Sequence, residues 1–374
     1  MPGIFSEETY LSGEETYRII SMDGGGLYGK FTAIMLRKLC ERHHHFFAQG
    51  LEHYISMVAG TSAGALNALL IAQEEDPREF ILSGGLERFW EEFGIFENRD
   101  PMNWSLSFGG ITPWLGRDEF LAVLDKYFGD KTFGDLSINF KVMVLTFEWG
   151  GRDDVPIKER RWTTRYFTNF SEEDANVKLV DVAYGAAAPP PFRAIRNGLG
   201  DAAIYAINPS LNAYALAKAK EARRRPIALL SMGVGFRETF FWLRDFDLGF
   251  LNFSMVPTNP LMGSWMPPGL QTLVDGPTEN ASSTSRKLLG PFYFRLNPGV
   301  LGPPNPSPGT IMAIVMSRNR FWHKWLQGAI DRATKRPETR DALDKASDFL
   351  DGDCWLLGEA ESNDWLNEIM NALS

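Results

Sequence analysis

The stretch Gly60-Thr61-Ser62-Ala63-Gly64 stands between an apolar run at 54–59 (Tyr-Ile-Ser-Met-Val-Ala) and a helix-like run at 65–72. We expect a buried strand to end here and a helix to begin. A Gly-x-Ser-x-Gly step at a strand-to-helix junction is typical of a nucleophile elbow, where the glycines permit a sharp turn and a close approach of helix and sheet. The alternative is a chance match in a chain with 35 glycines. The flanking pattern favours Ser62 as a nucleophile, with a helix N-terminus that stabilises a nearby anion.

A second glycine turn follows an earlier strand-like run at 17–22. It reads Asp23-Gly24-Gly25-Gly26-Leu27-Tyr28-Gly29, and a helix is predicted over 31–39, ending near 40–42. Backbone N–H groups in such a turn converge on one point and bind an anion. The identity of that anion separates the possible functions.

A nucleotide is the first candidate anion. The Gly-x4-Gly-Lys spacing that ends at Lys30 matches a P-loop, but Phe31 stands where Ser or Thr should hold Mg²⁺. A dinucleotide is favoured by the Gly-x-Gly-x-x-Gly spacing over 24–29, yet the acidic residue at the expected distance, Glu41, falls at a helix end instead of after a second strand.

The oxyanion of a tetrahedral intermediate is the third candidate. Gly24, Gly25 and Gly26 would supply its N–H donors. This interpretation is favoured because it also accounts for Ser62, while a purely structural tight turn stays open as a fourth.

Histidine does not provide an obvious base for Ser62. Three of the five histidines are adjacent at 43–45, and the others are His53 and His323. In the α/β-hydrolase order the histidine comes last, so only His323 qualifies, and it lies in an aromatic-rich helical stretch without a turn. Adjacent histidines splay around a helix, so no metal site is expected. An aspartate acting as sole base is the remaining solution.

The pairing of Asp-Gly-Gly-Gly at 23–26 with Gly-Thr-Ser-Ala-Gly at 60–64 resembles the patatin-like phospholipases. That resemblance implies a Ser–Asp dyad that works without histidine, metal or cofactor. The family also carries Asp-Gly-Gly or Asp-Gly-Ala followed by Asn-Pro, and the matching residues here are Asp201-Ala202-Ala203 and Asn208-Pro209. The resemblance therefore assigns the base to Asp201.

Two positions depart from the family pattern. Tyr28 stands where the family usually has Arg or Lys, although Lys30 follows closely. Ala202-Ala203 replaces the usual glycines and restricts φ beside Asp201, so we expect either a loop without positive φ or a less well-formed dyad.

An α/β fold is predicted from strands that alternate with helices. A strand is expected at 140–147 and helices at 118–127, 179–187 and 209–222, which implies a mostly parallel sheet covered on both faces. The resemblance covers residues 17–300 and implies a patatin-like three-layer sandwich. Residues 1–16 form a lead-in, and 301–374 form a linker and a C-terminal helical appendage with a break at 335–337.

Composition narrows the class of protein. The net charge of −9 and the pI near 5.2 do not suggest a DNA or RNA partner. Two cysteines give no disulfide framework and fit a reducing compartment. The first residues lack a signal pattern, and no apolar run is long enough to span a bilayer, so a cytoplasmic protein, peripheral at the inner membrane, is expected.

Aromatic residues are dense at 90–114 and 236–265. Core packing, a lipid entrance at a bilayer interface and a subunit contact in a homo-oligomer all remain open for them.

The function expected from the resemblance is a serine acyl hydrolase acting at a phospholipid membrane surface. A nucleotide-binding switch resting on Lys30 and a noncatalytic lipid-binding module are the alternatives. Some bacterial antiphage effectors that resemble this family are activated by cyclic oligonucleotides, and no residue here decides whether this chain has such an activator.

Overall fold

A computed structural model of the chain describes residues 16–43, 51, 54–93, 117–137, 140–151, 155–189, 193, 195–220, 222, 225–235, 268–299, 320–352 and 355. Its centre is a seven-stranded sheet in the order β4-β3-β2-β1-β6-β7, with β5 paired to β3. The strands are β1 (Tyr17–Met22), β2 (Met57–Thr61), β3 (Lys141–Glu148), β4 (Thr163–Thr168), β5 (Leu199–Asp201), β6 (Ile227–Met232) and β7 (Tyr293–Leu296).

Neighbouring strands from β3 through β2, β1 and β6 to β7 are parallel, while β4 and β5 run antiparallel to β3. Every residue of β1, β2 and β6 is buried. Such continuous burial is expected of parallel strands that are covered by helices on both faces.

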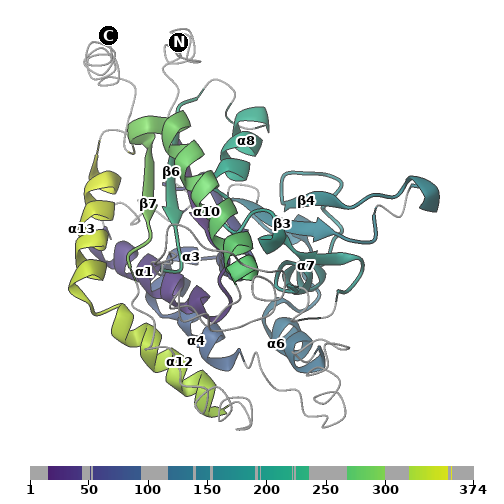
Figure 1. The fold of residues 1–374 in the computed structure, drawn as a ribbon, viewed down its shortest axis with the longest axis horizontal. Helices are drawn as coiled ribbons and strands as arrows, with labels where there is room; N and C mark the ends of the chain where they lie inside the picture. Colours follow the sequence, from purple (N-terminus) through teal and green to yellow (C-terminus); the bar gives the residue numbers. More distant parts are fainter. Residues whose placement is uncertain are drawn as a thin grey trace.

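Helices cover the sheet in two groups, as right-handed crossovers require. In one group α1 contacts α2, and α2 contacts α7; in the other, α8 contacts α10. Figure 1 shows α10 crossing in front of β6. The longer helices are α1 (Gly29–Arg42), α2 (Ala63–Ala72), α3 (Pro77–Leu82), α4 (Gly85–Glu92), α6 (Asp118–Phe128), α7 (Leu179–Ala186), α8 (Ser210–Lys220), α10 (Pro268–Leu289), α12 (Arg320–Ala333) and α13 (Pro337–Asp351). The α/β three-layer sandwich is confirmed.

The predicted elements are present with small shifts in their bounds. The strand expected at 54–59 begins at Met57 and continues to Thr61, so it runs directly into the elbow. Helix α10 was not predicted, because Gly276-Pro277 in its interior is a sequence signal for a turn.

The C-terminal helices pack into the same core as the sheet. The break at 335–337 is confirmed, and α13 begins at Pro337. Helix α13 contacts α1 and β7, and its Leu343 and Leu350 are buried. Arg18 on β1 donates through Nε to the carbonyl of Trp355 at 2.6 Å. This segment is therefore part of the folded body (Figure 1).

The aromatic segments are described only in part. Trp90 and Phe93 are buried in the core, as one of the three interpretations expected. Residues 94–114 and 236–265 lie outside the described residues. Within the described part of the chain, no helix combines the length and apolar character needed to cross a membrane.

Candidate active site

The elbow at Ser62 has a strained backbone. Ser62 has φ 53° and ψ −120°, at the junction of β2 and α2. Among the described non-glycine residues, Asn197 is the other with positive φ. A non-glycine residue in this region is uncommon and marks a functional constraint when the surroundings hold it there.

The two flanking glycines are required by packing. A Cβ on Gly60 would lie 2.2 Å from the Gly64 carbonyl oxygen, and a Cβ on Gly64 would lie 2.0 Å from the Met22 carbonyl oxygen. Both neighbours are backbone atoms, which cannot move aside as a side chain can. The glycines therefore let α2 start directly against β1, as the sequence pattern predicts.

The Ser62 hydroxyl is not used to hold the helix. Ser62 occupies the N-cap position of α2, yet its side chain makes no capping hydrogen bond, and the residue is 7% exposed. Its oxygen is thus a buried hydroxyl next to a helix N-terminus, without a structural role in that helix.

Strand register brings Asp201 to Ser62 from far along the chain. On β3, Leu145 pairs with Thr61, the last residue of β2. The next residue, Thr146, pairs with Asp201, the last residue of β5. Asp201 therefore takes the place beside β3 that follows the end of β2, where Ser62 also lies.

Burial changes the acidity of Asp201. The side chain is fully buried, and this desolvation raises the pKa of Asp201 to about 7, opposed by a hydrogen bond from the Ser62 hydroxyl and another from the Ala203 N–H. Oδ1 accepts the Ala203 bond at 2.8 Å. Among the described residues, no group makes a hydrogen bond of standard geometry to Oδ2. Ser62 is therefore close enough to influence the pKa of Asp201, but the two side chains do not form a hydrogen bond of standard geometry in this structure.

The alanines after Asp201 fit the loop without strain. Residues Ala202–Ile204 form a short 3-10 helix, η6, and Asp201 precedes it with φ −65°. No glycine is needed because this segment does not use positive φ. Of the two outcomes expected from the Ala202-Ala203 departure, the structure shows the first.

Of the three backbone N–H groups at Gly24–Gly26, one is hydrogen-bonded and two have no acceptor among the described residues. Gly24 donates to the Ile207 carbonyl at 3.0 Å, so it has no N–H to offer an oxyanion in this state. Gly25 and Gly26 are exposed, and no described group accepts from their N–H groups. Gly26 has φ 58° and open space around its Cβ position.

Adjacent carbonyls tie the loop and the elbow to the segment that follows Asp201. Thr61 donates through Oγ1 to the Ala206 carbonyl at 2.8 Å, and Gly24 donates to the next carbonyl, Ile207. The three parts of the site are therefore fixed to one another by hydrogen bonds. Sequence reasoning missed Thr61, because its partner lies 145 residues away.

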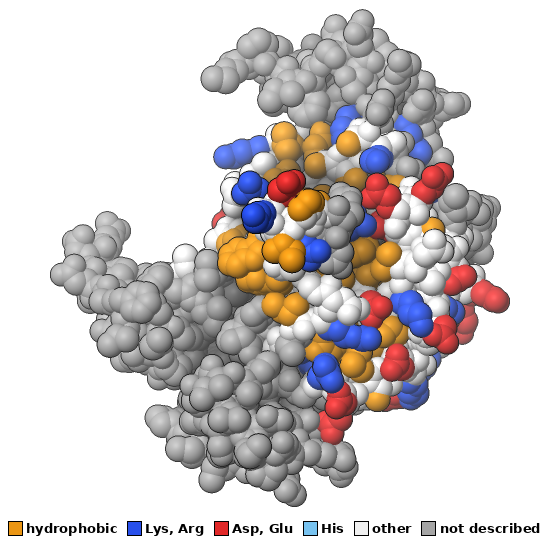
Figure 2. All heavy atoms as spheres, turned by 90° about the vertical axis from the view of Figure 1, so that its right-hand side faces the viewer, with side chains coloured by type: hydrophobic (Ala, Val, Ile, Leu, Met, Phe, Trp, Pro, Cys, Tyr) orange, Lys and Arg blue, Asp and Glu red, His pale blue; other side chains and the backbone are white. Residues whose placement is uncertain are grey.

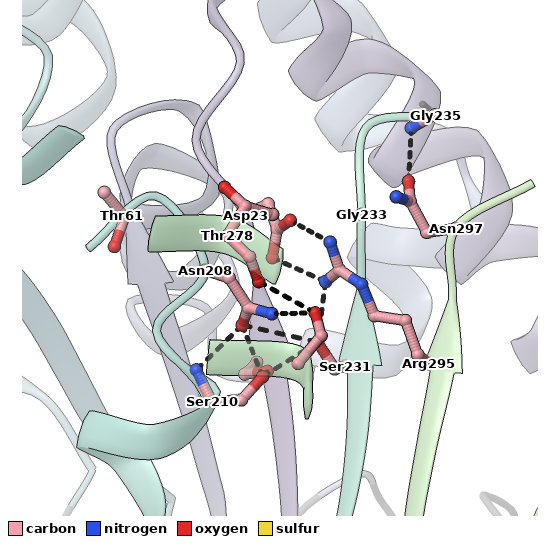
Figure 3. A network of polar contacts seen from close by, with 12 residues as sticks. Asp23, Thr61, Asn208, Ser210, Ser231, Gly233, Gly235, Thr278, Arg295 and Asn297 are labelled. Atoms are coloured by element: carbon pink, nitrogen blue, oxygen red, sulfur yellow. Dashed lines mark hydrogen bonds and ion pairs between the residues drawn. The ribbon is translucent and has the colours of Figure 1, made fainter. Parts of the chain in front are cut away.

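A buried ion pair holds the start of the glycine loop. Arg295 on β7 donates from one terminal nitrogen to Asp23 Oδ1 at 2.8 Å, and its other terminal nitrogen pairs with Oδ2 (Figure 3). The first of these nitrogens also donates to Ser231 Oγ at 2.7 Å. Asp23 and Arg295 side chains are 2% and 8% exposed. Two-point pairing of this kind fixes orientation as well as charge.

Polar side chains extend this network between the central strands β1 and β6 and the helices α8 and α10. Ser210 lies 2.8 Å from Ser231 and 2.9 Å from Ser21, and its backbone N–H donates to Asn208 Oδ1 at 2.9 Å (Figure 3). Asn208 also donates to Ser282 at 3.0 Å. The sequence signal that could have pointed to this network is the acidic Asp23 between a buried strand and a glycine turn, because a buried carboxylate is often paired with a cation.

Lys30 is engaged elsewhere. Its amine is buried and lies 3.4 Å from a Glu91 oxygen and 3.5 Å from an Asp331 oxygen. Phe31 packs in the core and Thr32 donates to the Gly233 carbonyl. In this structure a nucleotide phosphate would lack the P-loop cation.

The structure describes the side chain of one histidine out of five, so it bears on the expected lack of a histidine base or metal site only in part. His43 is buried with Nδ1 3.2 Å from Asp351. The side chains of the other four histidines lie outside the described residues. Across the part of the chain that the structure describes, no group of three His, Cys, Asp or Glu residues could hold a metal.

Comparison with known proteins identifies the family. A family model described as patatin-like phospholipase matches residues 20–209, which contain the glycine loop, the elbow, Asp201 and Asn208-Pro209. The chain belongs to the patatin-like phospholipase family. As a patatin-like phospholipase it is a hydrolase that acts on carboxylic ester bonds of lipids.

Similar proteins are known in several bacteria. The patatin-like chain is 28% identical over 331 residues to a protein named as the sporulation hydrolase CotR of Bacillus subtilis, covering 81% of this chain and 94% of CotR. It is 26% identical over 302 residues to a cGAMP-activated phospholipase of Pseudomonas aeruginosa, covering 77% and 80% of the two chains. A cGAMP-activated phospholipase of Escherichia coli is 26% identical over 207 residues, covering 52% and 53%.

Proposed function

We propose that this patatin-like phospholipase cleaves phospholipid acyl esters with Ser62 as nucleophile and Asp201 as base. Gly25 and Gly26 are proposed as the oxyanion donors. Gly24, the third residue expected for this role, supports the loop through its bond to Ile207. The proposal narrows the expected oxyanion hole to the two amides without an acceptor in the described structure.

The reaction divides into two steps. The Asp201 carboxylate takes the proton of Ser62 as Oγ attacks the ester carbonyl, and the negative charge forms on the carbonyl oxygen. The tetrahedral intermediate collapses, the C–O bond to the leaving alcohol breaks, and the proton passes from Asp201 to that alcohol. Asp201 then takes a proton from water, whose oxygen attacks the acyl carbonyl. The acyl–Oγ bond breaks, Asp201 returns the proton to Ser62 Oγ, and the fatty acid is released.

The buried carboxyl group of Asp201 is the observation that carries this proposal. A carboxylate of ordinary pKa is too weak a base to draw a proton from an alcohol efficiently. Burial raises the pKa of Asp201 to about 7 and places the base strength near the pH at which it must act. The position of Ser62 on a strained elbow, one register step away, supports the same assignment.

Turnover of phospholipid vesicles by three proteins tests the proposal. Each protein is assayed with and without a cyclic dinucleotide such as cGAMP, and wild type should release fatty acid and lysophospholipid, detected by mass spectrometry, in at least one of the two conditions. Ser62→Ala and Asp201→Asn should each lower the rate by a factor on the order of a thousand or more. Unchanged turnover in Ser62→Ala would overturn the assignment and favour a lipid-binding module with another source of activity.

We also propose that a cyclic oligonucleotide activates this enzyme in antiphage defence. The support is that two relatives at 26% identity are named cGAMP-activated phospholipases. Purified protein should then be inert on vesicles until a cyclic dinucleotide such as cGAMP is added. Full activity without any nucleotide would contradict this second proposal and leave the first intact.

A further inference from the structure

Four large hydrophobic side chains in the described part of the chain are exposed, and they lie in the segments that join β3 to β4 or flank β5. They are Ile157 (82% exposed), Trp162 (68%), Ile195 (41%) and Ile204 (38%). Ile157 lies in the 3-10 helix η5 (Ile157–Glu159), and Trp162 precedes β4. Figure 1 shows this connection between β3 and β4 reaching outward from the body of the molecule. We call residues 155–162 the hairpin tip.

Aromatic rings connect the hairpin tip to the catalytic edge. The Trp162 and Trp149 rings are 5.0 Å apart, and the Trp149 and Phe147 rings are also 5.0 Å apart. The Phe147 and Tyr205 rings are 6.0 Å apart, and the Tyr205 hydroxyl donates to the Thr146 carbonyl at 3.1 Å. We call Trp162, Trp149, Phe147 and Tyr205 the ring row.

The inner end of this ring row lies next to Asp201. Thr146 is the register partner of Asp201. A Cβ on Gly200 would lie 2.5 Å from Trp149 Nε1, so Trp149 packs on the residue before Asp201. Ile204 ends η6, the short helix that starts directly after Asp201. The exposed Trp162 is therefore joined through packed rings to the strand end that carries the proposed base.

Basic side chains accompany the exposed apolar ones. Lys158 and Arg161 are exposed and Arg160 is half-buried, against one exposed acid, Glu159. Over 152–162 the sequence adds Arg152, Asp153 and Asp154, which leaves a small positive charge of four basic against three acidic residues. Figure 2 shows hydrophobic side chains next to Lys and Arg on this side of the molecule.

This combination fits one kind of partner. Trp and aliphatic side chains enter the interfacial layer of a bilayer, and neighbouring Lys and Arg attract its anionic headgroups. A second copy of this acidic chain would also be attracted to these basic residues, but the proposed base for a lipid ester, Asp201, lies at the inner end of the ring row, and this position favours lipid as the occupant. The chemistry thus favours an anionic lipid surface.

We propose that the hairpin tip docks this protein on anionic phospholipid bilayers, with Ile157 and Trp162 entering the interface and Lys158 and Arg161 contacting headgroups. Because the ring row packs Trp162 against the end of the sheet that carries Asp201, docking would bring the proposed base close to the lipid surface. The inference rests on the proposed lipid hydrolysis for its biological use, but its physical test is separate.

Vesicle binding in a Ser62→Ala background tests the docking without lipid cleavage. The full chain is sedimented with vesicles of phosphatidylcholine alone or mixed with phosphatidylglycerol. Ile157→Ser/Trp162→Ser should lower the partition onto mixed vesicles by about tenfold or more. Lys158→Gln/Arg161→Gln should remove the preference for mixed vesicles and its dependence on salt.

A matched control separates location from charge. Arg340→Gln/Lys345→Gln removes two exposed positive charges from α13, which Figure 1 places away from the β3–β4 connection. This variant should bind both kinds of vesicle like its parent. Equal loss of binding in the control and in the tip variants would show a bulk charge effect and overturn the docking site.

The activity assays keep this inference distinct from the proposed function. With Ser62 present, Lys158→Gln/Arg161→Gln, whose side chains lie outside the ring row, should hydrolyse a soluble short-chain ester at the wild-type rate but lose activity on mixed vesicles, by about tenfold. The docking proposal is overturned if the tip variants bind vesicles as well as their parent does. It is also overturned if the tip substitutions abolish self-association of the protein and leave vesicle binding unchanged. Tip-dependent binding in a protein that hydrolyses no ester supports docking while the proposed function fails.

Discussion

Ser62 carries backbone strain that its neighbours impose. Its φ of 53° lies in the region that favours glycine, and the elbow is fixed by backbone contacts at Gly60 and Gly64. Strain of this kind costs on the order of 1–3 kcal/mol and persists only because the surroundings hold it.

Replacing Ser62 with two small residues should reveal the strain. Ser62→Gly and Ser62→Ala both remove the hydroxyl, but only glycine adopts this φ without a Cβ penalty. We expect Ser62→Gly to be more stable than Ser62→Ala by about 1 kcal/mol in urea unfolding. A less stable glycine variant would show that the elbow is relaxed in solution.

At the scale of elements, the contact between α2 and β1 depends on Gly64. The Met22 carbonyl oxygen lies 2.0 Å from the position of a Gly64 Cβ. Gly64→Ala should therefore destabilise the protein by at least about 3 kcal/mol, measured by urea unfolding.

Gly276→Ala is the control for this substitution. Gly276 is in helix α10, and apart from its chain neighbours and the nearby backbone of its own helix no atom lies within 4 Å of its Cβ position, so alanine there should change the free energy of unfolding by at most about 1 kcal/mol, with the following Pro277 opposing the gain in helix propensity. Equal effects at Gly64 and Gly276 would contradict the close packing of α2 on β1.

The Asp23–Arg295 pair links strands β1 and β7 below the glycine loop. Arg295→Met leaves the Asp23 carboxylate buried without its cation. We expect this substitution to lower the free energy of unfolding by about 3–5 kcal/mol. Adding Asp23→Asn to Arg295→Met should recover part of this loss, because the unpaired charge is removed. A double-mutant cycle of unfolding free energies with no coupling would show that the pair is not formed.

Sequence patterns could predict some of these residues and not others. Ser62 and the glycine loop were predictable because each is a local strand-turn-helix signal. Asp201 was assigned only through a family resemblance, since its place depends on where β2 ends and β5 begins along β3. Arg295 lies 272 residues from Asp23, and no periodicity encodes such a contact. The exposed hairpin tip also escaped prediction, because exposure depends on packing between distant segments.

At the scale of the whole molecule, the C-terminal helices and the sheet share one core. Leu343 on α13 is 2% exposed and belongs to the same buried cluster as the residues of β1. Leu343→Ala should lower the free energy of unfolding by about 2–5 kcal/mol within a single transition. Lys345→Ala, exposed on the same helix, should change it little. A separate early transition for the C-terminal segment would show an independent unit.

The pH dependence of Ser62 labelling by a fluorophosphonate tests the proposed dyad most directly. Burial raises the pKa of Asp201 to about 7, so below that pH the carboxyl is protonated and cannot accept the Ser62 proton. The labelling rate of wild type should rise with pH through about 7 and then level off. The adduct should map to Ser62 by mass spectrometry, and Asp201→Asn should label very slowly at every pH. A labelling rate that does not change with pH between about 5 and 9, or that is the same in Asp201→Asn as in wild type, would contradict Asp201 as the base.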